Sequence, residues 1–459
     1  MAGRALATAS GGLVLAVLAA KLWLAGALPL LTDECLYWVW SLHPAAGYFD
    51  QPPAIAWSLA ASRVVIGDSP TAIRLAPLLM GALIPLILAR WSGDRWRWTL
   101  WAVSLPVLFG LTFVATPDAW LLGAWALALA GALHGGRGWL LAGVATGLAG
   151  LAKYSGLAVL PLALLAVGPR EWRSRWPWLG VSAAVGLMLP NLWWNLEHDW
   201  LTFAFQWGEG IAHPHPPGLS GAAAQALGQV AVVGPPAALA ATWWAVRTFR
   251  AEDRTDRICW FTSVPLLAFF ALAAIGGPPE AHWPAPAWIS LGLGLSRDPG
   301  RPGRLAEMGA WFGLLMTGAA ALHCFRPLLP VVPDPASRFW EAPTLAAPVA
   351  QWALPVGPRP GAPLRPVLTE RYQEAAAIAY YARIEARVLP GCGRPNQYDL
   401  WPAADPASAL FVRPSTGGPP DCLGGRWTEV RGPNRIHPVD PVGRPTGRWQ
   451  VFELGPPVD

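Results

Sequence analysis

Long apolar stretches separated by short polar breaks dominate the first two thirds of the chain, from about residue 8 to residue 324. A helix needs about 20 mainly apolar residues to cross a bilayer, so the pattern predicts a polytopic helical membrane protein. Two stretches, 138–152 and 156–169, are short for a bilayer, which predicts tilted, broken or re-entrant segments. The eleven predicted spans are 8–31, 70–90, 98–116, 117–134, 138–152, 156–169, 176–195, 219–246, 257–276, 281–296 and 305–324.

The pattern changes after residue 325. Residues 326–367 are rich in proline, which predicts an extended linker. A helical stretch, ERYQEAAAIAYYARIEA, follows, and then come three short strand-like runs, ALFVRP, RWTEV and RWQVFEL. We therefore expect an all-α transmembrane domain over residues 1–325, the linker, and a small extracytoplasmic α/β domain over residues 368–459.

Arginine placement predicts which loops share a side of the membrane. One set of alternate loops carries nearly all the arginines, and the other set is almost free of them. The positive-inside rule then puts the N-terminus in the cytoplasm. It puts 33–69, 196–218, 277–281 and everything after about residue 325 outside. The arginines of the predicted cytoplasmic loops are Arg90, Arg95, Arg97, Arg137, Arg170, Arg173, Arg175, Arg247, Arg250, Arg254, Arg257, Arg297, Arg301 and Arg304.

Composition narrows the class further. Only 13% of the residues are charged, about half the share of an ordinary soluble domain. No block of basic residues interleaved with aromatic ones occurs, which argues against a nucleic-acid partner. Cys392 and Cys422 both lie in the polar tail and could form a disulfide there if the tail is outside, although their spacing alone does not fix a pairing.

Charged side chains on the predicted outer side are few, and each is costly beside a membrane. Asp33 and Glu34 end the first span, and the following CLYWVWSLH predicts a short helix lying along the interface. Tyr37 would then lie one turn after Asp33 on the same face. The acidic pair could simply cap this helix, or it could supply a general base or a metal ligand. A divalent metal held by Glu34 and His43 is conceivable, but no spacing requires one.

Three more outer-side groups have both a structural and a functional interpretation. Lys153 interrupts the apolar run GLAGLAKYSGL, where it could reach the headgroups or bind an anionic lipid phosphate. Asp118, in TPDAW, could cap a helix or contact a substrate. His282, in EAHWPAPAW, opens a predicted span and could face a cavity.

Several segments, taken in order, resemble one family. TDECLYWVWSLHPAAGYFDQPPAIAW and GDSPTAIRLAPLLMGAL are similar to the glycosyltransferase family 39 superfamily of GT-C enzymes. This family includes protein O-mannosyltransferases, the aminoarabinose transferase of lipid A, and galacturonosyltransferases of the lipopolysaccharide core. TPDAWLL, GLAGLAKYSGLAVLPL, PNLWWNLEHDWLTFAFQ, HWPAPAW and GRPNQYDLW extend the resemblance from about residue 30 to residue 290, with a weaker match in the tail.

The resemblance implies transfer of a sugar from a polyprenyl-phosphate carrier to a hydroxyl on the outer face of a bacterial inner membrane. Such a reaction needs a carboxylate that takes the acceptor's proton and cations that stabilise the departing phosphate. Asp33 is then the expected base, supported by Glu34, and Lys153 is the expected phosphate contact. The resemblance further implies donor-site roles for Arg63, Arg74, Tyr48, Asp50, Gln51, Tyr37, Asp118 and His282.

One departure limits the analogy. The aminoarabinose transferase has a basic residue at the place that Gln51 occupies here, so a cationic role cannot be carried over.

A lipid or sugar transporter and a non-catalytic membrane scaffold are the competing interpretations. A transporter would spread its charges to the midplane and both faces, whereas here they gather on one side. The sugar, the acceptor (an envelope lipid or a protein), metal dependence and the oligomeric state stay open from the sequence.

Overall fold

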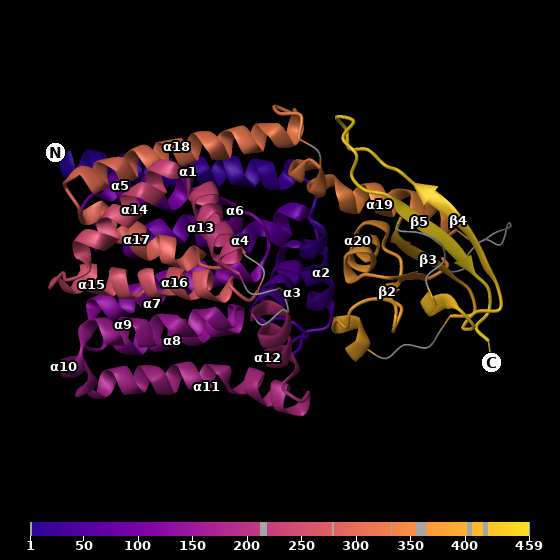
Figure 1. Ribbon diagram of the computed structural model, residues 1–459, viewed down its shortest axis with the longest axis horizontal. Helices are drawn as coiled ribbons and strands as arrows, with labels where there is room; N and C mark the ends of the chain where they lie inside the picture. Colours follow the sequence, from indigo (N-terminus) through magenta and orange to yellow (C-terminus); the bar gives the residue numbers. More distant parts are fainter. Residues whose placement is uncertain are drawn as a thin grey trace. The chain divides into compact units, whose positions relative to one another are not determined.

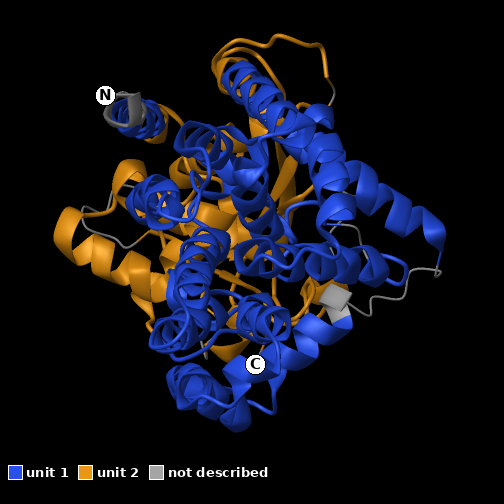
Figure 2. Cartoon of the chain, turned by 90° about the vertical axis from the view of Figure 1, so that its left-hand side faces the viewer, with its two compact units in different colours: residues 1–23, 45–55, 74–319 blue, residues 24–44, 56–73, 320–459 orange. Residues whose placement is uncertain are grey.

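The computed structural model describes residues 2–211, 218–277, 280–331, 333–354, 364–401, 406–415 and 421–458. The chain divides into two compact units, coloured separately in Figure 2. Unit 1 comprises residues 1–23, 45–55 and 74–319, and unit 2 comprises residues 24–44, 56–73 and 320–459. The long loop after the first helix therefore contributes to both units, which residue order alone did not predict.

Unit 1 is helical, and each predicted span overlaps at least one helix, although the number of eleven spans stays a prediction. Within the described residues, four helices are long and apolar enough to cross a membrane, and a bent pair raises the number to five. The helices of unit 1 (Figure 1) are α1 Ala2–Ala27, α4 Pro70–Leu88, α5 Arg95–Ser104, α6 Pro106–Leu111, α7 Pro117–His134, α8 Gly138–Ala152, η1 Tyr154–Ala158, α9 Val159–Val167, α10 Pro169–Trp172, α11 Arg175–Glu197, α12 Leu201–Phe205, η2 Gln206–Ile211, α13 Leu219–Val233, α14 Pro235–Thr248, α15 Arg254–Phe261, α16 Val264–Ala273, α17 Ala285–Arg297 and α18 Arg301–Phe325.

The single span expected over 219–246 is wrong. Helices α13 and α14 meet there at 114°. Gly234 takes a φ of +88° between them, a conformation that glycine adopts without a Cβ penalty. Pro235 then begins α14, where its missing N–H costs nothing. Likewise, the span expected over 98–116 is two helices, because Pro106 starts α6 afresh.

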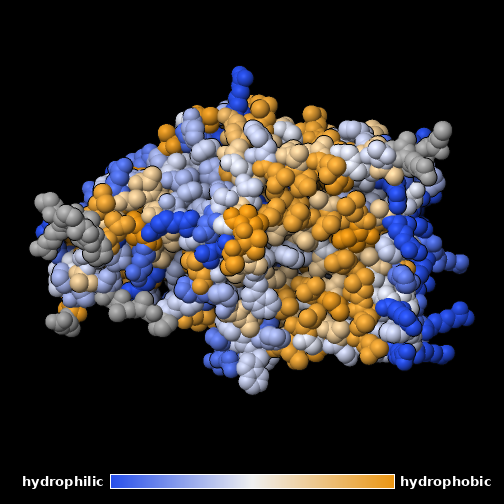
Figure 3. Space-filling view, turned by 180° about the vertical axis from the view of Figure 1, so that it is seen from behind, coloured by the Kyte–Doolittle hydropathy of each residue, from blue (hydrophilic) through white to orange (hydrophobic). Residues whose placement is uncertain are grey.

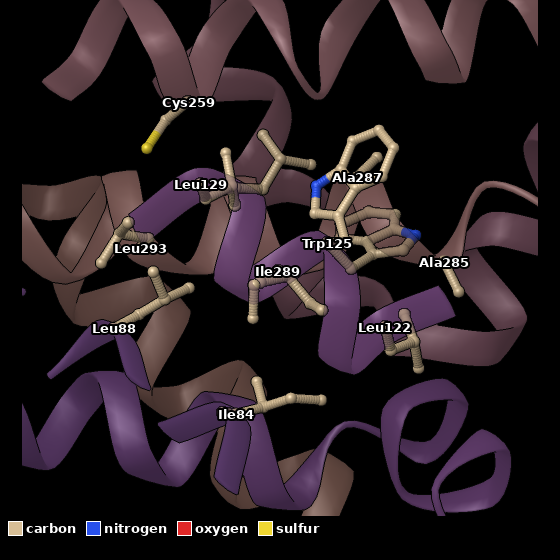
Figure 4. Packing of buried hydrophobic residues seen from close by; sticks show 14 of the residues in the cluster. Ile84, Leu88, Leu122, Trp125, Leu129, Cys259, Ala285, Ala287, Ile289 and Leu293 are labelled. Atoms are coloured by element: carbon tan, nitrogen blue, oxygen red, sulfur yellow. The ribbon is translucent and has the colours of Figure 1, made fainter. Parts of the chain in front are cut away.

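Alanine, leucine and tryptophan side chains make up most of the core of unit 1, part of which Figure 4 shows. Trp125 is fully buried and donates from its indole to Ser290 Oγ at 3.2 Å. Trp101 packs so closely on Gly292 that a Cβ there would lie 2.1 Å from its ring. Such side chains satisfy their N–H groups while they fill the space between helices, and this fixes how α5, α7 and α17 pack.

The arginine-rich loops gather at one end of unit 1. Arg254 pairs with Glu171 at 2.6 Å, and Arg297 pairs with Asp253 at 2.9 Å. Arg97 donates to the carbonyl oxygen of Asp298 at 2.9 Å. Figure 3 shows a broad hydrophobic band that ends at a row of hydrophilic side chains. The alternation predicted from the arginines is therefore reproduced in space, as expected for a multi-pass membrane protein.

Unit 2 combines two helices of the first loop with the C-terminal sheet domain. The five strands have the order β2-β1-β3-β5-β4; β1 is parallel to β2 and β3, and β5 is antiparallel to β3 and β4. Helix α20 connects β1 to β2, the usual crossover between parallel strands. The elements of unit 2 are α2 Thr32–Leu42, α3 Ala54–Ile66, η3 Pro335–Ser337, α19 Arg338–Trp352, β1 Val367–Thr369, α20 Tyr372–Ala382, β2 Ala386–Val388, η4 Gln397–Leu400, β3 Ala409–Pro414, η5 Asp421–Leu423, β4 Val430–Ile436 and β5 Trp449–Leu454.

Part of the linker prediction is wrong. Residues 338–352 form helix α19 despite two prolines inside it, Pro343 and Pro348. Its buried Leu345 and Val349 pack in the same apolar cluster as Val367 of β1 and Ile378 of α20. Tertiary packing thus outweighs the low helix propensity of proline. The stretch belongs to the folded tail.

A disulfide joins Cys392 and Cys422, whose Cα atoms are 5.4 Å apart. The sequence left this pairing open. Cys392 lies in the apolar cluster beneath Leu368, Phe411 and Phe452, on the face of the sheet away from α19. The bond therefore closes a loop of the chain onto that face.

Arg444 holds a buried polar cluster in unit 2, and its removal is expected to destabilise this unit. Its guanidinium contacts Asp440 and Asp334, and it donates to the carbonyl oxygens of His323 and Cys324 at 2.8 and 2.7 Å. Arg444→Ala removes the ion-pair partner of buried Asp440 and leaves buried Asp334 with His323 alone, so we expect a loss of about 3–5 kcal/mol in unfolding free energy. Chemical denaturation measures it, with the exposed Arg448→Ala as control; equal midpoints for the two variants would contradict the assignment.

Candidate active site

Helix α2 presents one open acidic face. Its residues Thr32, Glu34, Cys35, Leu36, Trp38, Val39, Trp40 and Ser41 are buried. Asp33 and Tyr37, one turn apart, are only partly buried. The sequence prediction that these two side chains share a face is therefore confirmed. Their partial exposure leaves this acidic face within reach of a substrate.

Burial and nearby charged groups of unit 2 shift the pKa of Asp33. Burial raises the pKa of its carboxyl above the ordinary value of 3.8, while the positive charges of Arg338 and Arg394 oppose this rise and Glu34 adds to it. Arg394 also donates to the Tyr372 hydroxyl at 3.0 Å. A carboxyl with a raised pKa beside cations is a suitable proton acceptor. The two arginines are also placed to attract an anionic substrate.

Glu34 has a structural role. Its carboxylate accepts a hydrogen bond from the Leu31 backbone N–H at 2.9 Å, at the first turn of α2. This is the capping interpretation that the sequence left open. The side chain is fully buried, so the predicted support of catalysis by Glu34 finds no basis in this geometry.

The metal pair Glu34 and His43 is wrong. Glu34 lies in the first turn of α2, and His43 caps its last turn. Nine residues of helix separate them by about 13 Å, too far for one ion. Over the part of the chain that the structure describes, no group of three or more His, Cys, Asp or Glu side chains could hold a metal.

Arg63 is held in a structural pair, so its predicted phosphate role is not supported. Its Nε lies 2.6 Å from Asp68 Oδ1, and Trp38 Nε1 donates to the same oxygen at 2.8 Å. The Tyr380 hydroxyl donates to the Asp68 carbonyl oxygen at 2.5 Å. Asp68 therefore ties α2, α3 and α20 together within unit 2.

Lys153, Asp118 and His282 come together in unit 1. Lys153 separates α8 from η1, and its Nζ lies 2.9 Å from Asp118 Oδ1 at the start of α7. The same Nζ lies 5.9 Å from the ring centre of Trp283. His282 interacts electrostatically with both Asp118 and Lys153. The three predicted donor-site residues thus form one cluster, although Lys153 is paired rather than free.

An apolar cavity of about 730 Å³ lies among α13, α14, α15, α16 and α17. Two glutamines of its lining hold the loop that carries His282. Gln225 donates to the carbonyl oxygen of Glu280 at 3.2 Å, and Gln229 donates to that of Ala281 at 2.8 Å. The bend at Gly234 lies between two of the lining helices. The cavity therefore adjoins the loop of the Lys153 cluster.

The loop GYFDQPP is anchored through its backbone. Thr202 donates to the Tyr48 carbonyl oxygen at 2.7 Å, and Gln206 donates to that of Asp50. A Cβ on Gly47 would lie 2.4 Å from the Trp194 ring, so only glycine fits. The Tyr48 side chain is fully buried, and its hydroxyl accepts from the Ala45 N–H. Tyr48 thus shapes the turn and does not line a donor site.

The remaining predicted donor-site residues differ in whether their surroundings allow contact with a substrate. Asp50 and Gln51 stay partly exposed beside the anchored turn, so a substrate role for them stays a prediction. Arg74 is fully buried with its guanidinium 4.9 Å from the Phe113 ring centre, which does not support the predicted phosphate contact.

Sequence reasoning missed Arg338 and Arg394. Arg338 opens α19, in a stretch read as a linker because of its prolines. Arg394 is the last residue of the GCGR turn in the tail. Only the fold brings them to Asp33. Gln225 and Gln229 could have been noticed as two amides four residues apart in an apolar helix, where a buried polar group needs a partner.

If Asp33 is the base, Arg338→Gln is expected to shift the acid limb of the pH–rate profile upward. The base works only when ionised, so the rate falls as the pH drops through its pKa. Arg338 opposes the rise of this pKa, and without its charge the pKa rises further. The profile of kcat/KM from pH 4 to 8 measures the effect, with the exposed Arg448→Gln as control. An unmoved acid limb would contradict the electrostatic link.

The chain shares its fold with a solved membrane protein, which confirms the expected fold class of a helical membrane domain with a small C-terminal α/β domain. It matches the crystal structure of ArnT from Cupriavidus metallidurans in the apo state over 99% of this chain and 98% of that one, with a TM-score of 0.62 and 16% identity. The structure of the same ArnT bound to undecaprenyl phosphate matches over 96% and 98%, with a TM-score of 0.60 and 17% identity.

Sequence comparison agrees with the fold. Residues 50–194 match the family model for dolichyl-phosphate-mannose-protein mannosyltransferase. A lipid A galacturonosyltransferase, RgtD of Rhizobium johnstonii, is 31% identical over 283 residues, which is 56% of this chain and 58% of that protein. The match thus spans a little over half the length of this curated relative.

Proposed function

We propose that the chain is an integral membrane glycosyltransferase that moves a sugar from a polyprenyl-phosphate donor to a hydroxyl of an envelope lipid. The observation that carries the proposal is the partly exposed carboxyl of Asp33 on α2, with Tyr37 on the same face and the charges of Arg338 and Arg394 acting on it. The undecaprenyl phosphate bound to ArnT supports the donor class, and the lipid A substrate of RgtD supports the acceptor class.

The reaction requires a base that takes the acceptor's proton and a cation that stabilises the departing phosphate. The acceptor oxygen forms a bond to the anomeric carbon as the bond from that carbon to the phosphate oxygen breaks. Asp33 takes the acceptor's proton, and the carrier phosphate leaves with the bonding electron pair. Lys153 stabilises the negative charge that develops on this phosphate. No general acid is needed, because a phosphate leaves as an anion.

The donor's hydrocarbon chain fits the apolar cavity of unit 1. The cavity adjoins the loop of residues 280–283, whose His282 lies in the Lys153 cluster. A polyprenyl chain in the cavity would therefore bring its phosphate toward Lys153. An apolar site with a few polar groups at one end is the usual arrangement for an amphiphilic ligand.

The Cys392–Cys422 disulfide supports an outer location for the tail, because disulfides persist in oxidising compartments. The arginine-rich end of unit 1 would then face the cytoplasm. We accordingly propose a bacterial inner-membrane protein with a cytoplasmic N-terminus and a periplasmic tail.

Mass spectrometry of envelope lipids tests the function directly. Cells that lack the protein should lose one sugar from one lipid, and expression of the wild-type chain should restore it. The mass difference, that of a hexose, pentose or uronic acid, identifies the sugar. Loss of a glycan from proteins instead would overturn the lipid acceptor, and an unchanged set of lipids and glycoproteins would overturn transferase function in favour of a transporter or scaffold.

A further inference from the structure

A second pocket, of about 430 Å³, lies within unit 2 and has no part in the chemistry above. Helix α2 contributes Trp38, Val39, Leu42 and His43 to its lining. With 3.6 residues per turn, these side chains project on the side of the helix away from Asp33 and Tyr37. The pocket is therefore separate from the open acidic face, although both are built on α2.

Aromatic rings form much of the pocket wall. The rings of His43 and Trp401 have centres 4.7 Å apart, and Tyr398 meets Trp401 edge-on at 5.4 Å. Trp401 is only partly buried. Flat rings with polar edges suit a ligand that has an apolar face and many hydroxyls, as a sugar ring has.

Cations outnumber the anion in this wall. Arg383 and Arg387 line the pocket, against the single carboxylate of Glu385. An arginine guanidinium matches the two oxygens of a carboxylate or phosphate. The lining thus combines stacking surfaces with a net attraction for an anion.

Arg383 is held in an unusual backbone conformation at this pocket. It caps α20 with φ 56° and ψ 36°, the left-handed region that glycine or asparagine occupies at lower cost. Its guanidinium lies 4.8 Å from the Trp38 ring centre and 4.9 Å from that of Tyr380. The side chain is still 51% exposed, and its Asp68 contact at 4.0 Å is long. An arginine kept at a strained, stacked and accessible position indicates a role for its charge.

We propose that this pocket binds an anionic saccharide, a sugar that carries a carboxylate or a phosphate. The aromatic walls contact the ring, and Arg383 with Arg387 contacts the anionic group. The site is non-catalytic and stands independently of the proposed transferase reaction. Two sources share this chemistry, a uronic acid and a phosphorylated amino sugar.

Calorimetric titration of the full-length protein in detergent micelles tests the site. The probes are galacturonic acid, glucosamine 1-phosphate, galactose, glucosamine and inorganic phosphate. We expect at least one anionic sugar to bind at least tenfold more tightly than its neutral counterpart and more tightly than inorganic phosphate. Preference for galacturonic acid assigns the site to a uronic acid, and preference for glucosamine 1-phosphate to a phosphosugar. Equal binding of inorganic phosphate and glucosamine 1-phosphate, without binding of galacturonic acid, would overturn the proposal.

Two variants assign the binding to this pocket. Arg383→Asn removes the charge and suits the left-handed backbone, so it should fold at least as well as the wild type. It should weaken binding at least tenfold, and so should Trp401→Ala. Arg431→Gln, which removes a 70% exposed arginine of β4, is the matched control and should bind normally. Unchanged affinity in Arg383→Asn would refute the site. Asp33→Asn should retain binding, so failure of the transferase proposal and of this one can be told apart.

Discussion

Replacing Asp33 with asparagine is expected to reduce turnover by about 10²- to 10⁴-fold, the usual contribution of a general base. Asparagine has nearly the same shape but cannot take the proton from the acceptor hydroxyl. Because Asp33 is not among the fully buried residues of α2 and asparagine has nearly its size, the change leaves the buried packing of that helix intact. We therefore expect the thermal midpoint to stay close to that of the wild type.

Glu34→Gln is the matched control for this prediction. The amide oxygen of glutamine can still accept the Leu31 N–H bond that Glu34 accepts now, so the helix keeps its cap. Most activity should remain, because the carboxylate of Glu34 is fully buried and caps α2. Transfer from a purified polyprenyl-phosphate sugar, measured in single turnover with both variants, decides the matter. If Asp33→Asn is as active as Glu34→Gln, Asp33 is not the base.

The sequence predicted the membrane helices well because their signal is local. Apolar length marks a span wherever it occurs, and α8 begins and ends where the sequence pattern placed it. Helix breaks were harder to predict. The bend at Gly234 depends on a single positive φ and a following proline, and neither outweighs the apolar run around it. The two prolines of α19 led to the opposite error, because they predicted an extended linker where a helix forms. Burial of Leu345 and Val349 stabilises that helix.

The sequence predicted the positions of site residues only where they lie within the same helix or loop. Helical periodicity alone gave the shared face of Asp33 and Tyr37, whereas the role of Asp33 as base came from the family resemblance. The resemblance also implied donor-site roles for Arg63 and Tyr48, yet Arg63 pairs with Asp68 and the Tyr48 hydroxyl accepts from the backbone of its own loop. Arg338 could not be found from sequence, because it is about 300 residues from Asp33 along the chain and only the fold of unit 2 makes their charges interact.

Lys153→Gln is expected to lower kcat/KM for the polyprenyl-phosphate donor by about 10- to 100-fold. A hydrogen bond to a charged group contributes about 1.5–3 kcal/mol, and the phosphate would lose one. Its pairing with Asp118 complicates the result, because both side chains are largely buried. Loss of the lysine alone leaves Asp118 unpaired and costs stability as well.

A double variant separates the two roles of Lys153. Lys153→Gln combined with Asp118→Asn replaces the buried pair by two amides, which can hydrogen-bond to each other, and should restore much of the lost stability. If Lys153 binds the donor phosphate, kcat/KM stays low in the double variant despite the recovered thermal midpoint. Lys153→Arg, which keeps the charge, should lose less than either. Recovery of kcat/KM together with stability would show instead that Lys153 serves only to pair Asp118, and the phosphate contact would have to be sought elsewhere.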